Sequence, residues 1–360
     1  MATPRLTSWT VVVPLLALAL VGAAGVLPIG TLFIVVAVPA LFGAVLAAVH
    51  HAEVVAHRVG EPFGTLILAV AVTVIEVALI VSMMLAGGPD KSALPRDTIF
   101  SAIMIICNGA VGLCLLAGGL KHHEQTFRLE GATSALAALI ALSTLSLVLP
   151  TFTTSATGPF YTEVQLAFAA VASLVLWGVF VFVQTVRHRD YFLPPAGADD
   201  ESAHAPPPSD AAAWTSFGLM GVALVAVIGL AKVLSPAIER GIAAAGAPQA
   251  VIGIVIALLV LLPETWAAVR AARADRLQTS LNLALGSALA SIGLTIPAVA
   301  LVAVLLGMPL QLGLAAKDLV LLALTFAVGA ITLGTGRTNV LQGAVHLVIF
   351  AAFLVLALVP

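Results

Sequence analysis

The sequence predicts an all-α polytopic membrane protein of about eleven transmembrane helices, built from one peripheral helix and two inverted five-helix repeats. Three observations support this fold class. Hydrophobic residues make up 61% of the 360 residues and charged residues only 9%, about a third of the usual share, which excludes a soluble fold. The apolar residues form runs of the roughly 20 residues that a membrane-spanning helix needs. One acidic, proline-rich segment divides these runs into two matching halves.

The apolar runs read as helices because they lack the alternation of barrel strands, and only helices or closed barrels satisfy their backbone groups in lipid. The run 277–306 is long enough for a tilted or broken helix. The run 9–27 also resembles a signal peptide, and its removal would leave the orientation of the other ten unchanged. The eleven runs, bounded by charges, Pro and Gly, are 9–27, 30–50, 63–86, 97–120, 131–150, 162–186, 214–236, 248–270, 277–306, 316–334 and 338–359.

The distribution of Lys and Arg predicts the orientation, since these residues accumulate on the cytoplasmic side. With the N-terminus inside, the inner segments carry Arg5, Arg58, Lys121, Arg128, Arg187, Arg189, Arg270, Arg273, Arg276 and Arg337. The outer segments carry Lys91, Arg96, Lys232, Arg240 and Lys317. The excess on the inner side predicts a cytoplasmic N-terminus and a C-terminus outside.

The segment between the two halves holds five prolines and four acidic residues from Pro194 to Asp210, so it cannot bury a core and is expected to be a mobile cytosolic linker. Five helices in each half place the halves in opposite orientations, which is the arrangement of inverted repeats in secondary transporters. The predicted domains are therefore a peripheral helix at 1–28, a first repeat at 29–186, the linker at 187–213 and a second repeat at 214–360.

Two acidic residues lie deep inside apolar runs, where each costs about 2.5 to 3.5 kcal/mol on insertion scales. Glu76 lies near the middle of 63–86, and Glu264 lies in 248–270. Each run is the second helix of its half. Two acids at equivalent positions favour a functional pair over a structural role for either one.

The next helix in each half carries polar and small residues at helical spacing. Hydroxyl and amide oxygens suit Na⁺ or Ca²⁺ and small residues allow close helix packing, although such side chains also simply join helices. Pro263 removes a backbone hydrogen bond beside Glu264, and Thr73 shares a helix face with Glu76. The candidate cation- and proton-binding residues are Glu76, Glu264, Asn108, Ser287, Thr73 and Ser291, with the two carboxylates as the metal ligands.

Four stretches resemble the calcium/proton antiporter branch of the cation/Ca²⁺ exchanger superfamily: Gly60 to Glu76, Ile106 to Leu113, Leu262-Pro263-Glu264 and Gly286 to Leu294. The resemblance implies ten helices plus a peripheral one, a bacterial inner membrane, and cation binding by Glu76 and Glu264. Many members carry Gly-Asn-x-x-Glu, whereas Ala71-Val72-Thr73 and Leu261-Leu262-Pro263 stand here. That departure keeps Na⁺ or K⁺ open as cargo beside Ca²⁺.

The expected function is a secondary cation/proton antiporter that exports Ca²⁺ by alternating access, with Glu76 and Glu264 meeting near the bilayer midplane and binding either the cation or protons. The alternatives are Na⁺ or K⁺ exchange in the same fold and, from another class, a passive cation channel. We expect no enzymatic activity and no cofactor. The expected partners are lipid, the cation and protons. A formal charge of -2 with no basic face argues against nucleic acid.

A second polar group, His50, Glu53 and His57, follows helical spacing at the predicted cytosolic end of 30–50. Such a group suits pH regulation, proton collection or metal binding, and it is the only surface candidate for a membrane enzyme. Solvated imidazoles are the simpler interpretation. His346, alone in its apolar run, is expected to be a helix-packing residue.

Overall fold

The computed structural model describes residues 8–26, 28–60, 63–193 and 207–359. Within these ranges ten helical segments are long and apolar enough to cross a membrane. The prediction of an all-α polytopic fold is confirmed, and the chain is an integral membrane protein. The spans are Thr31–Val59, Leu66–Leu85, Leu94–His122, Leu129–Phe152, Glu163–Arg187, Asp210–Ile242, Ala250–Arg273, Leu277–Leu306, Ala316–Leu333 and Val340–Leu358.

The first predicted run forms helix α1 (Trp9–Ala23), which is shorter than the other ten. Its 15 residues rise about 22 Å, less than the roughly 30 Å of a bilayer core. The helix packs against α2 (Thr31–Val59) and α9 (Asp210–Ala244). A short helix packed on two long ones is consistent with the peripheral role that the sequence predicts for it.

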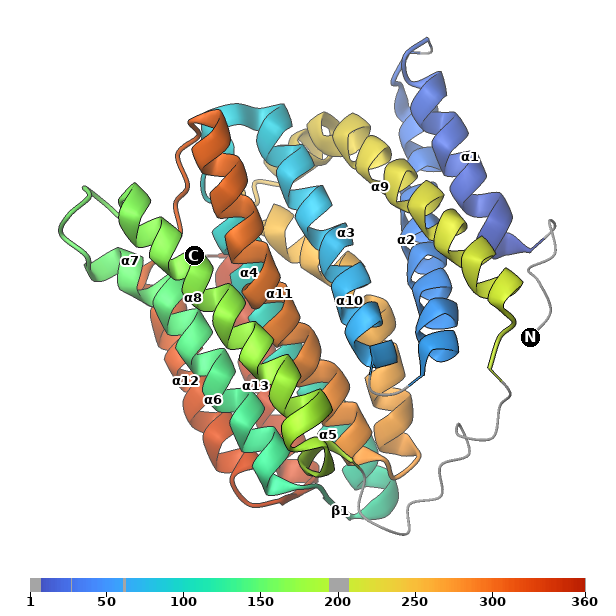
Figure 1. Cartoon of the computed structure of the whole chain (residues 1–360). Helices are drawn as coiled ribbons and strands as arrows, with labels where there is room; N and C mark the ends of the chain where they lie inside the picture. Colours follow the sequence, from blue (N-terminus) through green and yellow to red (C-terminus); the bar gives the residue numbers. More distant parts are fainter. Residues whose placement is uncertain (1–7, 27, 61–62, 194–206, 360) are drawn as a thin grey trace. The chain divides into compact units, whose positions relative to one another are not determined.

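The chain forms two compact units, and the first comprises Met1–Gly88 and Asp200–Ile252. It contains α1, α2, α3 (Phe63–Gly87) and α9, with α2 packed against the other three (Figure 1). The His51 ring nitrogen Nε2 lies 3.0 Å from the Thr10 carbonyl and so joins α2 to α1. Arg58 Nε donates to the Asp210 carboxylate at 2.7 Å, which joins the end of α2 to the start of α9.

The second unit comprises Pro89–Asp199 and Gly253–Pro360. Its elements are η1 (Gly88–Lys91, beginning in the first unit), α4 (Leu94–Met104), η2 (Ile105–Ala110), α5 (Val111–His122), β1 (Glu124–Thr126), α6 (Leu129–Ser143), η3 (Thr144–Val148), α7 (Leu149–Phe152), α8 (Glu163–Phe182), η4 (Val183–Arg187), η5 (Arg189–Phe192), α10 (Ala250–Arg273, also beginning in the first unit), α11 (Leu277–Leu306), α12 (Ala316–Leu333), β2 (Arg337–Asn339) and α13 (Val340–Leu358). The core lies around α11, which packs against α4, η2, α5, α6 and α8.

Three spans of the second unit contain a π-helical turn, at η2, η3 and η4. Such turns add one residue to the helical repeat and shift the side chains that follow around the helix axis. The predicted helix 97–120 is therefore one span built from α4, η2 and α5. The long run 277–306, by contrast, forms the single helix α11 and continues through Pro297.

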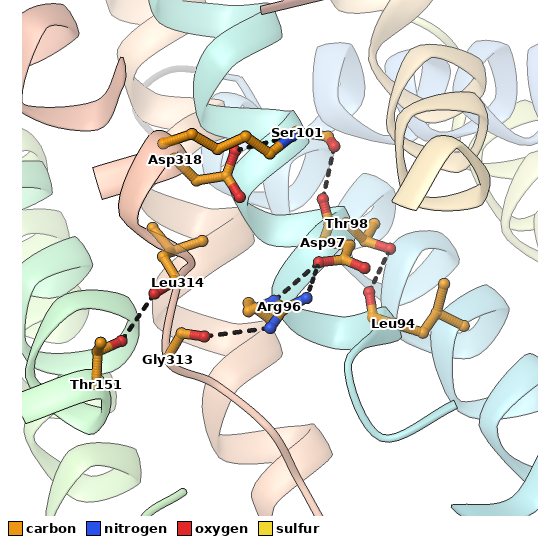
Figure 2. Close-up of polar contacts among 10 residues, drawn as sticks. Leu94, Arg96, Asp97, Thr98, Ser101, Thr151, Gly313, Leu314 and Asp318 are labelled. Carbon is orange, nitrogen blue, oxygen red and sulfur yellow. Dashed lines mark hydrogen bonds and ion pairs between the residues drawn. The ribbon is translucent and has the colours of Figure 1, made fainter. Parts of the chain in front are cut away.

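The connection between α11 and α12 is held at the predicted outer end of the second unit (Figure 2). Arg96, in the first turn of α4, contacts the Asp97 carboxylate at 2.7 Å and donates to the Gly313 carbonyl at 3.2 Å. The Thr151 hydroxyl donates to the Leu314 carbonyl at 2.9 Å. In the first turn of α12, which begins at Ala316, the charged groups of Lys317 and Asp318 lie 3.9 Å apart. The contacts of Arg96 and Thr151 thus hold the chain just before α12.

Two short strands, β1 and β2, form an antiparallel pair in which Gln125 lies opposite Thr338. These strands were not predicted, because three-residue strands in loops show no periodicity. The pair joins the α5–α6 connection to the α12–α13 connection.

Residues 194–206 of the predicted linker lie outside the described residues. On either side of this gap the chain forms η5 and, from Asp210, α9. Each compact unit contains helices from both predicted repeats. The division into repeats at 29–186 and 214–360 stays a prediction.

Candidate cation and proton site

Glu264 lies on α10, fourteen residues after its first residue and nine before its last, and is only 8% exposed. Pro263 lacks a backbone N–H, so the carbonyl one turn earlier has no helical hydrogen bond from this position. Helix α10 nevertheless continues through Pro263. The sequence therefore places a carboxylate inside a membrane-spanning helix, where its charge requires a compensating partner.

Ser287, from the middle of α11, supplies one such partner: its hydroxyl donates to the Glu264 carboxylate. A hydrogen bond of this kind stabilises the charged form of the acid. Ser291 follows one turn later on α11 and is also buried. The structure thus brings together Glu264 and Ser287, which the sequence analysis chose by separate arguments.

A small cavity of about 10 Å³ lies beside this pair. That volume is about the minimum that holds one water molecule, so the site has room for one small species such as a water or a dehydrated cation. Apart from the carboxylate and two hydroxyls, the lining is apolar, which leaves few oxygens to bind a cation. The lining residues are Ile106, Ala110, Leu261, Glu264, Thr265, Ala268, Ala284 and Ser287.

Glu76 lies near the middle of α3 in the first unit and is only 2% exposed. Thr73, one turn earlier, is also buried, and its hydroxyl donates to the Ala69 carbonyl at 2.9 Å. This hydrogen bond to the carbonyl one turn earlier uses the hydroxyl proton, but the Thr73 oxygen can still accept a hydrogen bond. The role of Glu76 and Thr73 in cation binding stays a prediction.

Asn108, unlike Glu264 and Ser287, does not line the cavity. Its neighbours Ile106 and Ala110 do, and residues two positions away lie on nearly opposite faces of a helix. The Asn108 amide nitrogen donates to Thr325 Oγ1 at 2.9 Å, and its amide oxygen lies 3.2 Å from His346 Nδ1. A direct role of Asn108 in cation binding is not tested by these contacts and stays a prediction.

The group of His50, Glu53 and His57 lies near the end of α2 in the first unit. His50 is half-buried, with its ring centroid 6.2 Å from that of Trp9, whereas Glu53 is exposed. Among the residues that the structure describes, no three His, Cys, Asp or Glu side chains are arranged to hold a metal ion. The metal-binding interpretation of this group therefore loses support. Regulation or proton collection stays a prediction.

A family model described as sodium/calcium exchanger protein matches residues 29–186 and 215–359, which is most of the chain. The chain belongs to the sodium/calcium exchanger protein family. This membership confirms the resemblance that the motifs around Glu76 and Glu264 indicate.

Individual members of this family are similar over nearly the whole chain. A protein of Sinorhizobium fredii that is named an ionic transporter is 54% identical over 323 residues, covering 89% of this chain and 87% of that protein. The sodium-potassium/proton antiporter ChaA of Escherichia coli is 37% identical over 346 residues, covering 95% and 93%. The native structure of YfkE matches with a TM-score of 0.71 at 15% identity, covering 98% and 100%, which supports the fold alone.

Two further polar residues of the second unit, Thr265 and His346, were not among the predicted site residues. Thr265 follows Glu264 directly and lines the cavity, so its position in Pro-Glu-Thr was a signal for it. His346 was expected to be a helix-packing residue, and it is buried between elements, where its ring contacts Asn108. Nothing in the sequence indicates this contact, because the two residues are 238 positions apart.

Proposed function

We propose that this chain is a cation/proton antiporter in which a cation and protons compete for Glu264 and, in the other half of the sequence, for Glu76. The observation that carries the proposal is a buried carboxylate in a membrane-spanning helix, with a hydroxyl partner and a cavity for one small species. Such a carboxylate binds a proton or a cation, and either ligand neutralises its charge.

Competition of this kind couples the two ions without further machinery. A site that carries an uncompensated charge pays a large desolvation cost when it is closed off from water. The empty charged site therefore does not exchange easily between inward-open and outward-open states, whereas the loaded site does. Protons that enter down their gradient then drive the cation outward.

Two classes of cargo follow from the relatives. The antiporter ChaA is named for Na⁺ and K⁺, and YfkE is named a Ca²⁺/H⁺ antiporter. Ca²⁺ prefers six to eight oxygens with several carboxylates among them. If both Glu76 and Glu264 bind the cargo, Ca²⁺ and two protons are electrically equivalent. If Glu264 alone binds the cargo, a monovalent cation such as Na⁺ or K⁺ balances the single negative charge of its carboxylate.

The proposed orientation places the protein in a bacterial inner membrane with its C-terminus outside. The excess of Lys and Arg in the inner segments supports it. The orientation of the ten spans does not depend on whether α1 crosses the membrane. The cytoplasmic location of the N-terminus does depend on it, because the N-terminus lies inside only if α1 crosses. Nothing in this mechanism requires a cofactor or an enzymatic step.

The decisive experiment measures pH inside sealed proteoliposomes when Ca²⁺, Na⁺ or K⁺ is added outside in turn. Exchange makes the interior more alkaline, because protons leave as the cation enters. A channel instead gives cation uptake that follows the membrane potential without coupled proton movement. Absence of any proton movement with all three cations contradicts antiport, and formation of a chemical product would indicate an enzyme.

Substitution of Ser287 by Ala is expected to weaken the apparent affinity for the cation by roughly ten- to a hundredfold, because the charged form of Glu264 loses a hydrogen bond worth about 1.5 to 3 kcal/mol. Cation-dependent proton movement over a range of cation concentrations measures this. Ser143→Ala is the matched control, since Ser143 is also buried but donates only to the Leu139 carbonyl, at 2.7 Å. Unchanged affinity in Ser287→Ala would exclude the hydroxyl from the site.

A further inference from the structure

A chain of buried polar side chains lies on the face of η2 that is turned away from the cavity. It consists of Thr332 and Thr325 on α12, His346 on α13 and Asn108 on η2 itself. Asn108 is fully buried and His346 is 1% exposed. Polar groups buried this deeply are costly unless every one of them is paired.

The donors and acceptors of the hydrogen bonds among these four side chains can be assigned without conflict. The Thr325 hydroxyl donates to the Leu321 carbonyl at 2.7 Å, so its oxygen is left to accept from the Asn108 amide nitrogen. The Asn108 amide oxygen can only accept, so His346 Nδ1 carries the proton between them. His346 Nε2, 3.1 Å from Thr332 Oγ1, then accepts from that hydroxyl. A neutral imidazole with its proton on Nδ1 therefore satisfies both Asn108 and Thr332.

Through Asn108, this row of polar side chains is connected to η2, which is a π-helical turn. A π-helical turn is a rare insertion that is found frequently at functional sites. Asn108 lies inside this turn, so its hydrogen bonds with Thr325 and His346 connect the turn to α12 and α13.

Helix α13 is a rigid support, because its backbone is in direct contact with α5. A Cβ atom added to Gly343 would lie 2.5 Å from the Leu116 nitrogen, and one added to Gly112 would lie 3.0 Å from the His346 Cβ. Neither glycine tolerates a larger side chain without movement of a helix. His346 therefore has little freedom to move away from Asn108.

We propose that His346 and Thr325 are positioning residues that hold η2 through Asn108 and so set the cavity wall that Ile106 and Ala110 form beside Glu264. The inference rests on the proposed function, since it assigns the fit of the cation to this wall. A wall displaced by a few tenths of an ångström changes a cavity of about 10 Å³ substantially. Loss of the support weakens cation binding and changes the preference among cations of different size.

Two substitutions of His346 separate positioning from simple packing. In His346→Asn the side-chain amide takes the place of Nδ1, keeps a donor for Asn108 and loses the contact with Thr332. In His346→Gln the amide takes the place of Nε2, keeps the contact with Thr332 and leaves the Asn108 oxygen without its donor. We expect His346→Gln to raise the KM for the cation about tenfold and to change the ratio of KM values among Na⁺, K⁺ and Ca²⁺. His346→Asn stays within about threefold of the unaltered protein.

Thr325→Val provides a milder test on the other side of Asn108, because valine has nearly the shape of threonine but cannot accept from the amide nitrogen. Its matched control is Thr98→Val. Thr98 is equally buried and its hydroxyl makes the same back-bond, to the Leu94 carbonyl at 2.9 Å, but it has no part in the chain of polar residues. Thr325→Val is expected to raise KM severalfold and Thr98→Val to leave it unchanged.

Cation binding is also measured without transport, as the rise in melting temperature in detergent when Na⁺, K⁺ or Ca²⁺ is added. No rise in the unaltered protein with any cation contradicts the proposed function itself. A rise in the unaltered protein that persists undiminished in His346→Gln and Thr325→Val contradicts the positioning role. Equal loss of maximal rate in both His346 variants, with unchanged KM and unchanged cation preference, shows packing alone and likewise overturns it.

Discussion

Glu264→Gln and Glu76→Gln are each expected to abolish cation-dependent proton movement, with a loss of at least about 100-fold. Glutamine keeps the shape of glutamate, but its amide does not release a proton near neutral pH and carries no charge that attracts a cation. Loss of one charge–charge contact in a water-poor site costs several kcal/mol, and each 1.4 kcal/mol is tenfold. The measurement is the internal pH of proteoliposomes after addition of the cation.

Glu163→Gln is the matched control, because Glu163 is an exposed glutamate in the first turn of α8. It is expected to transport like the unaltered protein. Gel filtration and thermal unfolding in detergent establish that each variant is folded before its transport is compared. Substantial exchange by a folded Glu76→Gln or Glu264→Gln protein would remove that residue from the mechanism.

Most of the fold was predictable because lipid imposes a strong constraint on the sequence. A run such as 277–306 has no stable alternative to a helix in hydrocarbon, and it forms the single helix α11. The length of the first helix was less predictable, since the apolar run 9–27 extends past Ala23, where α1 ends. Composition does not show where this helix ends, because the residue that follows Ala23 is Ala24 in a helical conformation rather than a glycine or proline that would mark a stop.

The candidate site was predictable in its chemistry and less so in its geometry. Insertion cost alone selects Glu264, and helical spacing selects Ser287, which the structure joins by a hydrogen bond. The helical spacing of polar residues in the run 97–120 assumed an unbroken α-helix. The π-helical turn that begins at Ile105 changes this register, and Asn108 faces Thr325 and His346. No local signal in the sequence indicates these contacts, because Thr325 and His346 lie 217 and 238 positions further along the chain.

The pH dependence of cation affinity is the strongest test of a carboxylate that cation and protons share. Each proton that the cation must displace makes its apparent affinity up to about tenfold stronger for every unit by which pH rises, until the carboxylates are deprotonated and the affinity levels off. Maximal rate is expected to change less. Isotope or dye uptake from about pH 6 to pH 9 covers the range in which buried carboxylates are documented to titrate.

The slope of this dependence also distinguishes the two classes of cargo. A cation that displaces one proton gives a slope of about one decade per pH unit, and one that displaces two gives about two. Na⁺ or K⁺ at Glu264 alone corresponds to the first case, and Ca²⁺ at both carboxylates to the second. The Glu163→Gln control should reproduce the slope of the unaltered protein. An affinity that stays flat across the whole range would mean that cation and proton bind at separate sites, and the shared-carboxylate mechanism would have to be abandoned.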